Sequence, residues 1–171
     1  MEYGFSDFEM IAEPIVTHNK MLSSQNYIQH GNTSVFSHSV AVAAHSFDLA
    51  KKLHIRCDQV SLVRGALLHD FFLYDWHITK KFNGRLHGFE HPNTAYQNAA
   101  KYFQINDIES DIIRKHMWPL TLTKIPRCRE SWLVCAVDKY CSVLEIMGLN
   151  KYNDHTYIEN ILCKKRQETF G

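Results

Sequence analysis

Hydrophobic residues recur at spacings of three and four along most of the chain, which is the period of amphipathic helices. Positions 6–9 read Ser-Asp-Phe-Glu, a capping-box pattern, and an apolar stripe over residues 8–16 follows it. This predicts a first helix of about three turns. Residues 21–33 are polar and break the pattern, and Ser34 then stands where a second helix is expected to begin.

Further segments carry the same period, and each has a start or stop signal. Asp58 is a plausible N-cap, and Pro119 is expected to end a helix because proline excludes helical geometry from the residue before it. Proline is also favoured at the first helical position, so His91-Pro92 predicts a helix with His91 at its N-terminus. The predicted segments are residues 34–53, 58–72, 91–103, 107–116, 129–144 and 154–165.

No segment shows a convincing strand pattern or an internal repeat, so the fold class is all-α. We expect a single-domain helical bundle of about six to seven helices. In the second helix, His38 shares a stripe with Ala41 and Val42 and should point inward. The stripes expected to be buried are Val35, Ala41, Val42, Ala44, His45, Leu49 and Leu53 in that helix, and Trp132, Leu133, Ala136, Val137, Tyr140 and Leu144 in the helix after Arg129.

Length and charge narrow the class of protein. The 171 residues suit one domain over positions 1–171, with a core at about 30–150 and terminal helices packing on it. The 19 basic residues nearly balance the 18 acidic ones, so neither nucleic acid nor a membrane is an expected partner. Five cysteines without a Cys-x-x-Cys pair, no signal-like N-terminus and no long apolar run indicate a soluble, cytoplasmic protein. The oligomeric state stays open.

Histidines and aspartates at widely separated positions on apolar segments provide the candidate chemistry. They are His38, His69, Asp70, His91, His116 and Asp138. Imidazole nitrogens and carboxylate oxygens suit zinc, iron, manganese or nickel, and the lack of paired cysteines excludes soft-ligand sites. Burying these ionisable groups without a cation would cost several kcal/mol. The pattern therefore predicts metal binding.

The order His, His-Asp, His, His, Asp resembles the HD-domain superfamily of metal-dependent phosphohydrolases, over about residues 30–150. The chain is most similar to small stand-alone bacterial members with the patterns His-Asp-x-Phe-Leu-Tyr-Asp-Trp, His-Gly-Phe-x-His-Pro and Lys-His-Met-Trp-Pro. The resemblance implies one or two divalent ions of iron, manganese, nickel, cobalt or zinc. One ion would take His38, His69, Asp70 and Asp138, and a second would take Asp70, His91 and His116. In a site with one ion, His91 and His116 would instead bind phosphate or move protons.

Additional candidates surround these residues. Asp75 and His87 join Asp70 as possible catalytic groups, although Asp75 is equally compatible with an exposed helix end and His87 competes with His91 as a ligand. Residues 77–90 have the composition of a substrate-facing loop. Candidate phosphate contacts are Lys81, Arg85, Lys115 and Lys139, and the aromatic residues Phe71, Tyr74, Trp76, Phe89 and Trp118 could stack on a base.

The leading interpretation is hydrolysis of a nucleotide or other small phosphate ester by a metal-activated water. Cyclic di-GMP hydrolysis is not supported, because Met117-Trp118-Pro119 follows His116 where the HD-GYP enzymes carry a second histidine and later Gly-Tyr-Pro. The di-iron oxygenases related to inositol oxygenase share the ligand pattern and give a second hypothesis. A third is a non-catalytic, nucleotide-binding regulatory module that keeps its metal for folding.

Overall fold

The computed structural model describes residues 7–78, 81–82 and 85–149, with side chains described outside 81–85. Ser6 of the expected capping box and the expected helix at 154–165 lie outside these ranges. The helices are α1 (Asp7–Val16), α2 (Asn19–Ser23), the 3-10 helix η1 (Ser24–Asn26), α3 (Val35–Lys52), α4 (Gln59–Leu68), α5 (His87–Tyr102), α6 (Asp107–Lys115) and α7 (Arg129–Ile146). The described part is therefore mostly helical, as predicted.

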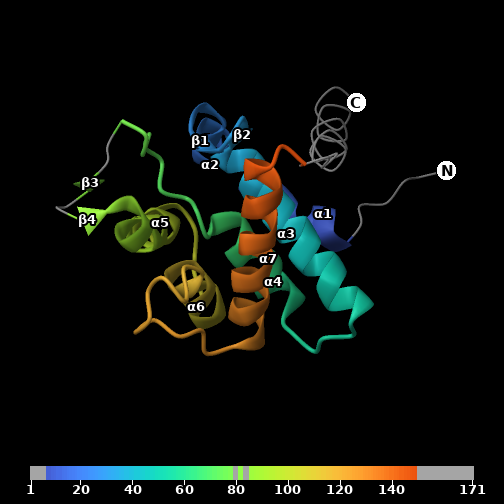
Figure 1. Ribbon diagram of the computed structural model, residues 1–171. Helices are drawn as coiled ribbons and strands as arrows, with labels where there is room; N and C mark the ends of the chain where they lie inside the picture. The colour runs from blue at the N-terminus through green and yellow to red at the C-terminus, as the bar shows by residue number, and fades with distance from the viewer. Residues whose placement is uncertain (1–6, 79–80, 83–84, 150–171) are drawn as a thin grey trace, which may run out of the picture.

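The helices pack around α4, which lies at the centre of the bundle (Figure 1). Helix α3 packs against α4 and α7. Helix α6 packs against α4, α5 and α7, and α1 packs against α4. Figure 1 shows α5 and α6 on one side of α7 and α1 on the other. The side chains buried most completely in this core include Ile15, Phe36, Leu62, Leu67, Phe71, Ile112 and Ile113.

Side-chain caps set the starts of three long helices. Ser34 accepts a hydrogen bond from the Ser37 N–H at the start of α3, and Asp58 accepts one from Ser61 at the start of α4. Both starts agree with the sequence-based prediction, because capping depends on residues within one turn. At α6, Asn106 and Glu109 form a reciprocal capping box, which was not among the predicted caps.

The predicted end of α4 and the predicted start of α5 were wrong. Helix α4 ends at Leu68 and not at Phe72, since the backbone turns after His69 and Leu73 adopts a positive φ of 57°. Helix α5 begins at His87, so His91 lies in its second turn and not at its N-terminus. Pro92 is tolerated inside α5 although it lacks the N–H that would bond to the carbonyl of Gly88.

Short strands correct the expectation that the chain has none. Strands β1 (Ile28–His30) and β2 (Thr33–Ser34) pair antiparallel, as do β3 (Lys81–Phe82) and β4 (Arg85–Leu86). Gly31 makes the first turn with a φ of 55°, which glycine adopts without strain. Strands of two or three residues are too short to show the alternation by which a strand is recognised.

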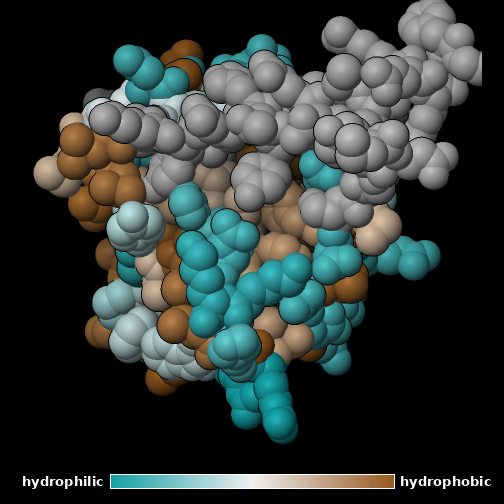
Figure 2. Space-filling model, turned by 90° about the vertical axis from the view of Figure 1, so that its right-hand side faces the viewer, coloured by the Kyte–Doolittle hydropathy of each residue, from teal (hydrophilic) through white to brown (hydrophobic). Residues whose placement is uncertain are grey.

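The expected stripes of α3 and α7 were only partly right. Leu133 and Val137 are buried as expected, and α7 also buries Val134, Cys135, Asp138 and Cys141. The expected stripe residues that are exposed are Leu49, Leu53, Trp132, Ala136 and Tyr140. Helix α7 contacts both α3 and α6, and these two neighbours decide which of its apolar faces is covered. On the face shown in Figure 2, hydrophilic side chains run across the middle of the described surface and hydrophobic ones gather toward its left edge. None of the described helices combines the length and apolarity that crossing a bilayer requires.

The crossing of α4 and α6 is closely packed at Gly65. A Cβ at this position would lie 2.5 Å from Cδ1 of Ile112. We therefore expect Gly65→Ala to lower the free energy of unfolding by about 1–3 kcal/mol, as overpacking usually does. Urea unfolding checks this. Adding Ile112→Val removes the clashing methyl, so the double variant should lose less stability than the sum of the two single variants; strict additivity would contradict the account.

Candidate metal centre

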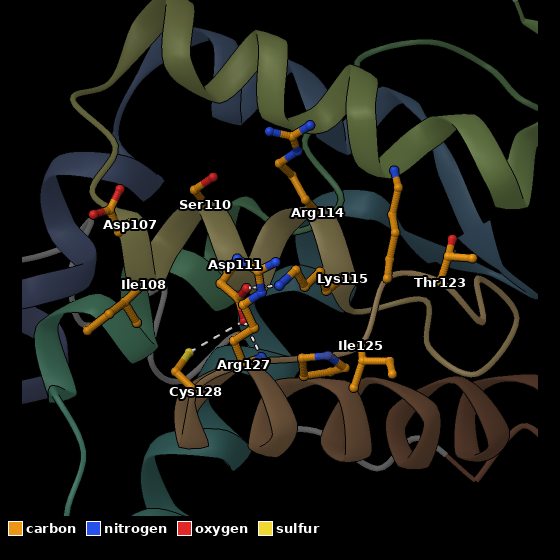
Figure 3. Close-up of a pocket in the computed structure, with 12 residues that line it drawn as sticks. Asp107, Ile108, Ser110, Asp111, Arg114, Lys115, Thr123, Ile125, Arg127 and Cys128 are labelled. Carbon is orange, nitrogen blue, oxygen red and sulfur yellow. Dashed lines mark hydrogen bonds and ion pairs between the residues drawn. The ribbon is translucent and has the colours of Figure 1, made fainter.

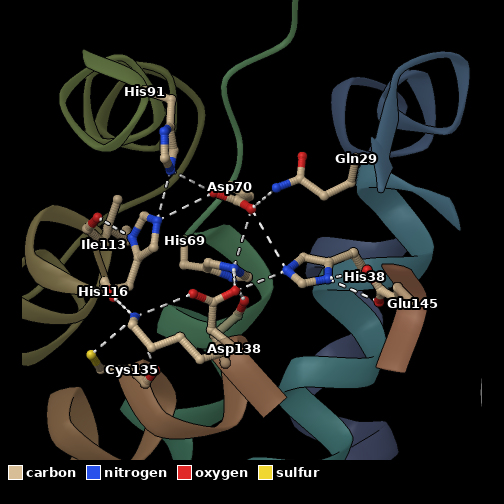
Figure 4. A network of polar contacts seen from close by, with 12 residues as sticks. Gln29, His38, His69, Asp70, His91, Ile113, His116, Cys135, Asp138 and Glu145 are labelled. Atoms are coloured by element: carbon tan, nitrogen blue, oxygen red, sulfur yellow. Dashed lines mark hydrogen bonds and ion pairs between the residues drawn. The ribbon is translucent and has the colours of Figure 1, made fainter. Parts of the chain in front are cut away.

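Five segments deliver the predicted histidines and aspartates to one place in the interior (Figure 4). His38 lies on α3, His69 and Asp70 follow α4, and His91 lies on α5. His116 follows α6, and Asp138 lies on α7. All of them are buried. Two groups have ligand atoms within 4.8 Å of one another: His38, His69, Asp70 and Asp138 form the first cluster, and Asp70, His91 and His116 form the second.

Asp70 belongs to both clusters because its two oxygens face different histidines. Its Oδ1 lies 3.1 Å from Nε2 of His91 and 3.4 Å from Nε2 of His116. Its Oδ2 lies 3.4 Å from Nε2 of His69 and 3.7 Å from Nε2 of His38. A carboxylate held in this way can bridge two cations, which an imidazole cannot do.

Hydrogen bonds to backbone carbonyls orient three of the histidines. Nδ1 of His69 donates to Ala66 (2.7 Å), and Nδ1 of His116 donates to Ile113 (2.9 Å). Nδ1 of His91 donates to His87 (3.0 Å). Because a carbonyl oxygen can only accept, these Nδ1 atoms carry the hydrogen, and in the neutral ring Nε2 has a lone pair directed into the cluster.

Several inward atoms lack the partner that such an arrangement needs. Nε2 of His69 and Oδ1 of Asp70 are buried without a hydrogen-bond partner among the described residues. Nε2 of His91 and Nε2 of His116 lie only 2.8 Å apart, so two lone pairs face each other when both rings are neutral. One cation in each cluster would satisfy all of these atoms. The nitrogen and oxygen donors therefore fit divalent transition metals.

The electrostatics of the first cluster support the same interpretation. Burial lowers the pKa of His38, but hydrogen bonds and charges from Asp138 and Glu145 outweigh it and raise that pKa to about 9. Burial raises the pKa of Asp138, yet its hydrogen bonds with His38 and His69 outweigh burial and hold that pKa well below its ordinary value. The carboxylates are thus ionised, and without a metal the protons on the histidines supply the balancing positive charge.

Glu145 is a further buried residue of the site that sequence reasoning missed. Both of its carboxylate oxygens lie 3.0 Å from Nδ1 of His38, so it accepts that proton and directs Nε2 toward the first cluster. Nε2 of His38 lies 3.1 Å from Oδ1 of Asp138. Metal-binding histidines commonly have such a carboxylate partner. A signal did exist, since Glu145 lies two helical turns after Asp138 and hence on the same face of α7.

Among the predicted phosphate contacts, Lys139 is adjacent to the clusters. Its Nζ donates to the carbonyl oxygen of His116 (2.7 Å) and lies 3.8 Å from Oδ2 of Asp138. Lys81 and Arg85 have described backbones in β3 and β4, but their side chains lie outside the described part. Their role stays a prediction.

Lys115 lies in a different place, a groove of about 900 Å³ between α6 and residues 123–128 (Figure 3). Its ammonium pairs there with Asp111, one turn earlier on α6. Asp111 also accepts a hydrogen bond from the Arg127 N–H. The contacts that the structure gives Lys115 thus involve this groove and not the His and Asp clusters.

The two other predicted catalytic groups differ in their surroundings. Asp75 has a side chain that is 42% exposed and accepts a hydrogen bond from the His77 N–H. His87 accepts or donates a 2.8 Å hydrogen bond with the Tyr74 hydroxyl, and its ring stacks between those of His91 and Trp76. Burial and the neighbouring His91 lower the pKa of His87 to about 3. His87 therefore contacts the ring of a cluster residue, whereas the described contact of Asp75 is local.

Comparison with known proteins identifies the family. The model of the HD domain matches residues 35–142, more than half of the chain, and the matched range contains all six residues of the clusters. Neither the curated proteins nor the solved structures gave a match. HD domains are typically metal-dependent phosphohydrolases, and the two buried clusters sharing Asp70 are consistent with a two-metal site of this kind. The chain therefore belongs to the HD-domain family.

Proposed function

We propose that the protein is a metal-dependent phosphohydrolase that hydrolyses a nucleotide or another small phosphate ester. The observation that carries this proposal is the sharing of Asp70 between two buried clusters whose histidines direct Nε2 inward. Two cations held about 3.5–4 Å apart lower the pKa of a bound water and neutralise charge on a phosphoryl group. The metals would be held by His38, His69, Asp70, His91, His116 and Asp138.

The residues of the chain have separable tasks in this proposal. Backbone carbonyls and Glu145 fix the histidine rings, so the ligand atoms are in place before substrate arrives. The charge of Lys139 lies next to Asp138, and Lys139 is our preferred phosphate contact. Asp75 remains a candidate for proton transfer, and His87, whose lowered pKa keeps its ring neutral, remains a candidate for contact with the substrate. We further propose that residues 1–171 form one domain around this centre.

A second candidate is oxygen chemistry at a di-iron centre. The ligand set is four histidines and two aspartates, and the shared carboxylate would suit two iron ions as well as two redox-inert ones. We rank hydrolysis first because it is the typical activity of HD domains.

The test is phosphate release from a panel of phosphomonoesters and nucleotides after separate loading with manganese, iron, nickel, cobalt or zinc. We expect at least one metal to support turnover of at least one compound, and a chelator to abolish it. Iron-dependent oxygen consumption with a polyol or phosphonate, without phosphate release, would favour the oxygenase. Thermal stabilisation by a nucleotide without any turnover would contradict an enzymatic role and favour a regulatory module.

A further inference from the structure

Gln29 on β1 contacts the shared carboxylate from the side opposite the second cluster (Figure 4). Its Nε2 donates a hydrogen bond of 2.5 Å to Oδ2 of Asp70. The residue is only 6% exposed, and its Oε1 is buried without a hydrogen-bond partner among the described residues. Gln29 lies outside the range matched by the family model. It therefore joins the site through a contact that neither the sequence nor the family comparison assigns.

Independent contacts hold the segment that carries Gln29. The Val35 N–H donates to the carbonyl of Tyr27 (2.8 Å), and Nε1 of Trp76 donates to the carbonyl of Ile28 (3.1 Å). At the turn, a Cβ on Gly31 would lie 3.3 Å from the carbonyl oxygen of Glu145, so the hairpin packs closely on the end of α7. The position of Gln29 is thus set by α3, by the segment after Asp70 and by α7.

We infer that Gln29 is a positioning residue that fixes the rotation of the Asp70 carboxylate. The terminal torsion of an aspartate is broad, so without a donor on one oxygen the carboxylate plane can rotate away from the orientation in which each oxygen faces one cluster. The amide holds Oδ2 toward His38 and His69, which leaves Oδ1 directed at the second cluster. The hydrogen bond is strengthened by the charge of the carboxylate, while the neutral amide adds no charge of its own.

The free amide oxygen has a complementary role. In Figure 4, Oε1 points away from His38 and His69. Since Oε1 can only accept, it would take a hydrogen bond from a water or hydroxyl group beside the Gln29 amide. Gln29 would then link the shared Asp70 carboxylate to that water or hydroxyl group. This inference rests on the proposed metal centre. Its test must therefore show whether the role of Gln29 or the metal centre itself has failed.

The test compares Gln29→Leu, which removes both polar atoms at similar size, with Gln25→Leu, the same change at an exposed position four residues earlier. Cobalt binding to the metal-free proteins is followed by titration and by the visible absorption spectrum, which reports coordination geometry. We expect Gln29→Leu to weaken cobalt binding about 10–100-fold and to alter the spectrum, as loss of a residue that orients a ligand commonly does. Gln25→Leu should match the parent protein in both measurements.

Gln29→Glu provides a second test if the leucine variant does not fold. It places a carboxylate beside Asp70, so the metal-free protein should melt at a lower temperature than the parent. Cobalt should raise its melting temperature by more than it raises that of the parent. An unchanged cobalt affinity and spectrum in Gln29→Leu, or an unchanged melting temperature in metal-free Gln29→Glu, would overturn the inference. Cobalt binding that survives Asp70→Asn unaltered would instead refute the metal centre itself.

Discussion

Replacing Asp70 by asparagine is expected to abolish metal-dependent phosphate release and to remove most of the bound metal. The variant keeps the shape of the side chain but loses the negative charge that both clusters share. Loss of a residue that merely orients a ligand costs 10–100-fold, so loss of the bridging ligand should cost more than about 100-fold in activity. Metal content measured by mass spectrometry and phosphate release on the responsive substrate give the two readouts.

Asp75→Asn is the matched control for the metal-content measurement. It makes the same chemical change five residues later, at a side chain that is 42% exposed. We expect this control to bind metal as the parent does. Circular dichroism should show that both variants keep their helices. Phosphate release by folded Asp70→Asn at the parent rate would mean that the reaction occurs elsewhere on the protein.

Replacing His116 by glutamine is expected to separate the two clusters. It removes a ligand of the second cluster and leaves His38, His69, Asp70 and Asp138 in place. The metal content should fall from about two ions per chain to about one, and hydrolysis should fall more than about 100-fold, because a single ion cannot clamp both sides of the phosphoryl group. Titration of the metal-free protein and the phosphate-release assay measure these effects.

His45→Gln controls for the loss of an imidazole, since His45 lies in a groove between α3 and α7 together with Leu49 and Tyr140. It should retain both ions and full activity. A parent protein that binds one ion, with unchanged stoichiometry in His116→Gln, would contradict a binuclear mechanism. His116 would then serve as a phosphate or proton contact in a mononuclear site.

Local signals account for the parts of the fold that were predicted correctly. The starts of α3 and α4 follow from Ser34 and Asp58, which bond to backbone groups within the same turn. The end of α4 and the start of α5 were missed by four residues each. Asp70 and Leu73 lie outside α4 because the backbone turns there, and no residue type at these positions predicts that turn.

Some residues of the candidate site were predicted from the sequence, and others were not. The order of the six histidines and aspartates in the chain was sufficient to predict the family, which the HD-domain match confirms, and the structure brings those six residues together as candidate ligands. Gln29 and Glu145 were not predicted, because the residue that each contacts through a hydrogen bond lies 41 or 107 positions away along the chain. Lys115 was expected near the substrate, but it lies in the groove beside Asp111.

The sequence by itself determined the helical class, most helix positions and the residue types available to a metal, because capping and periodicity depend on neighbours within a few residues. Only the tertiary structure decided which face of α7 is buried, which way each imidazole points and how one carboxylate serves two clusters. The reason is physical. The rotation of a helix and the direction of a side chain are set by packing against segments that are distant along the chain.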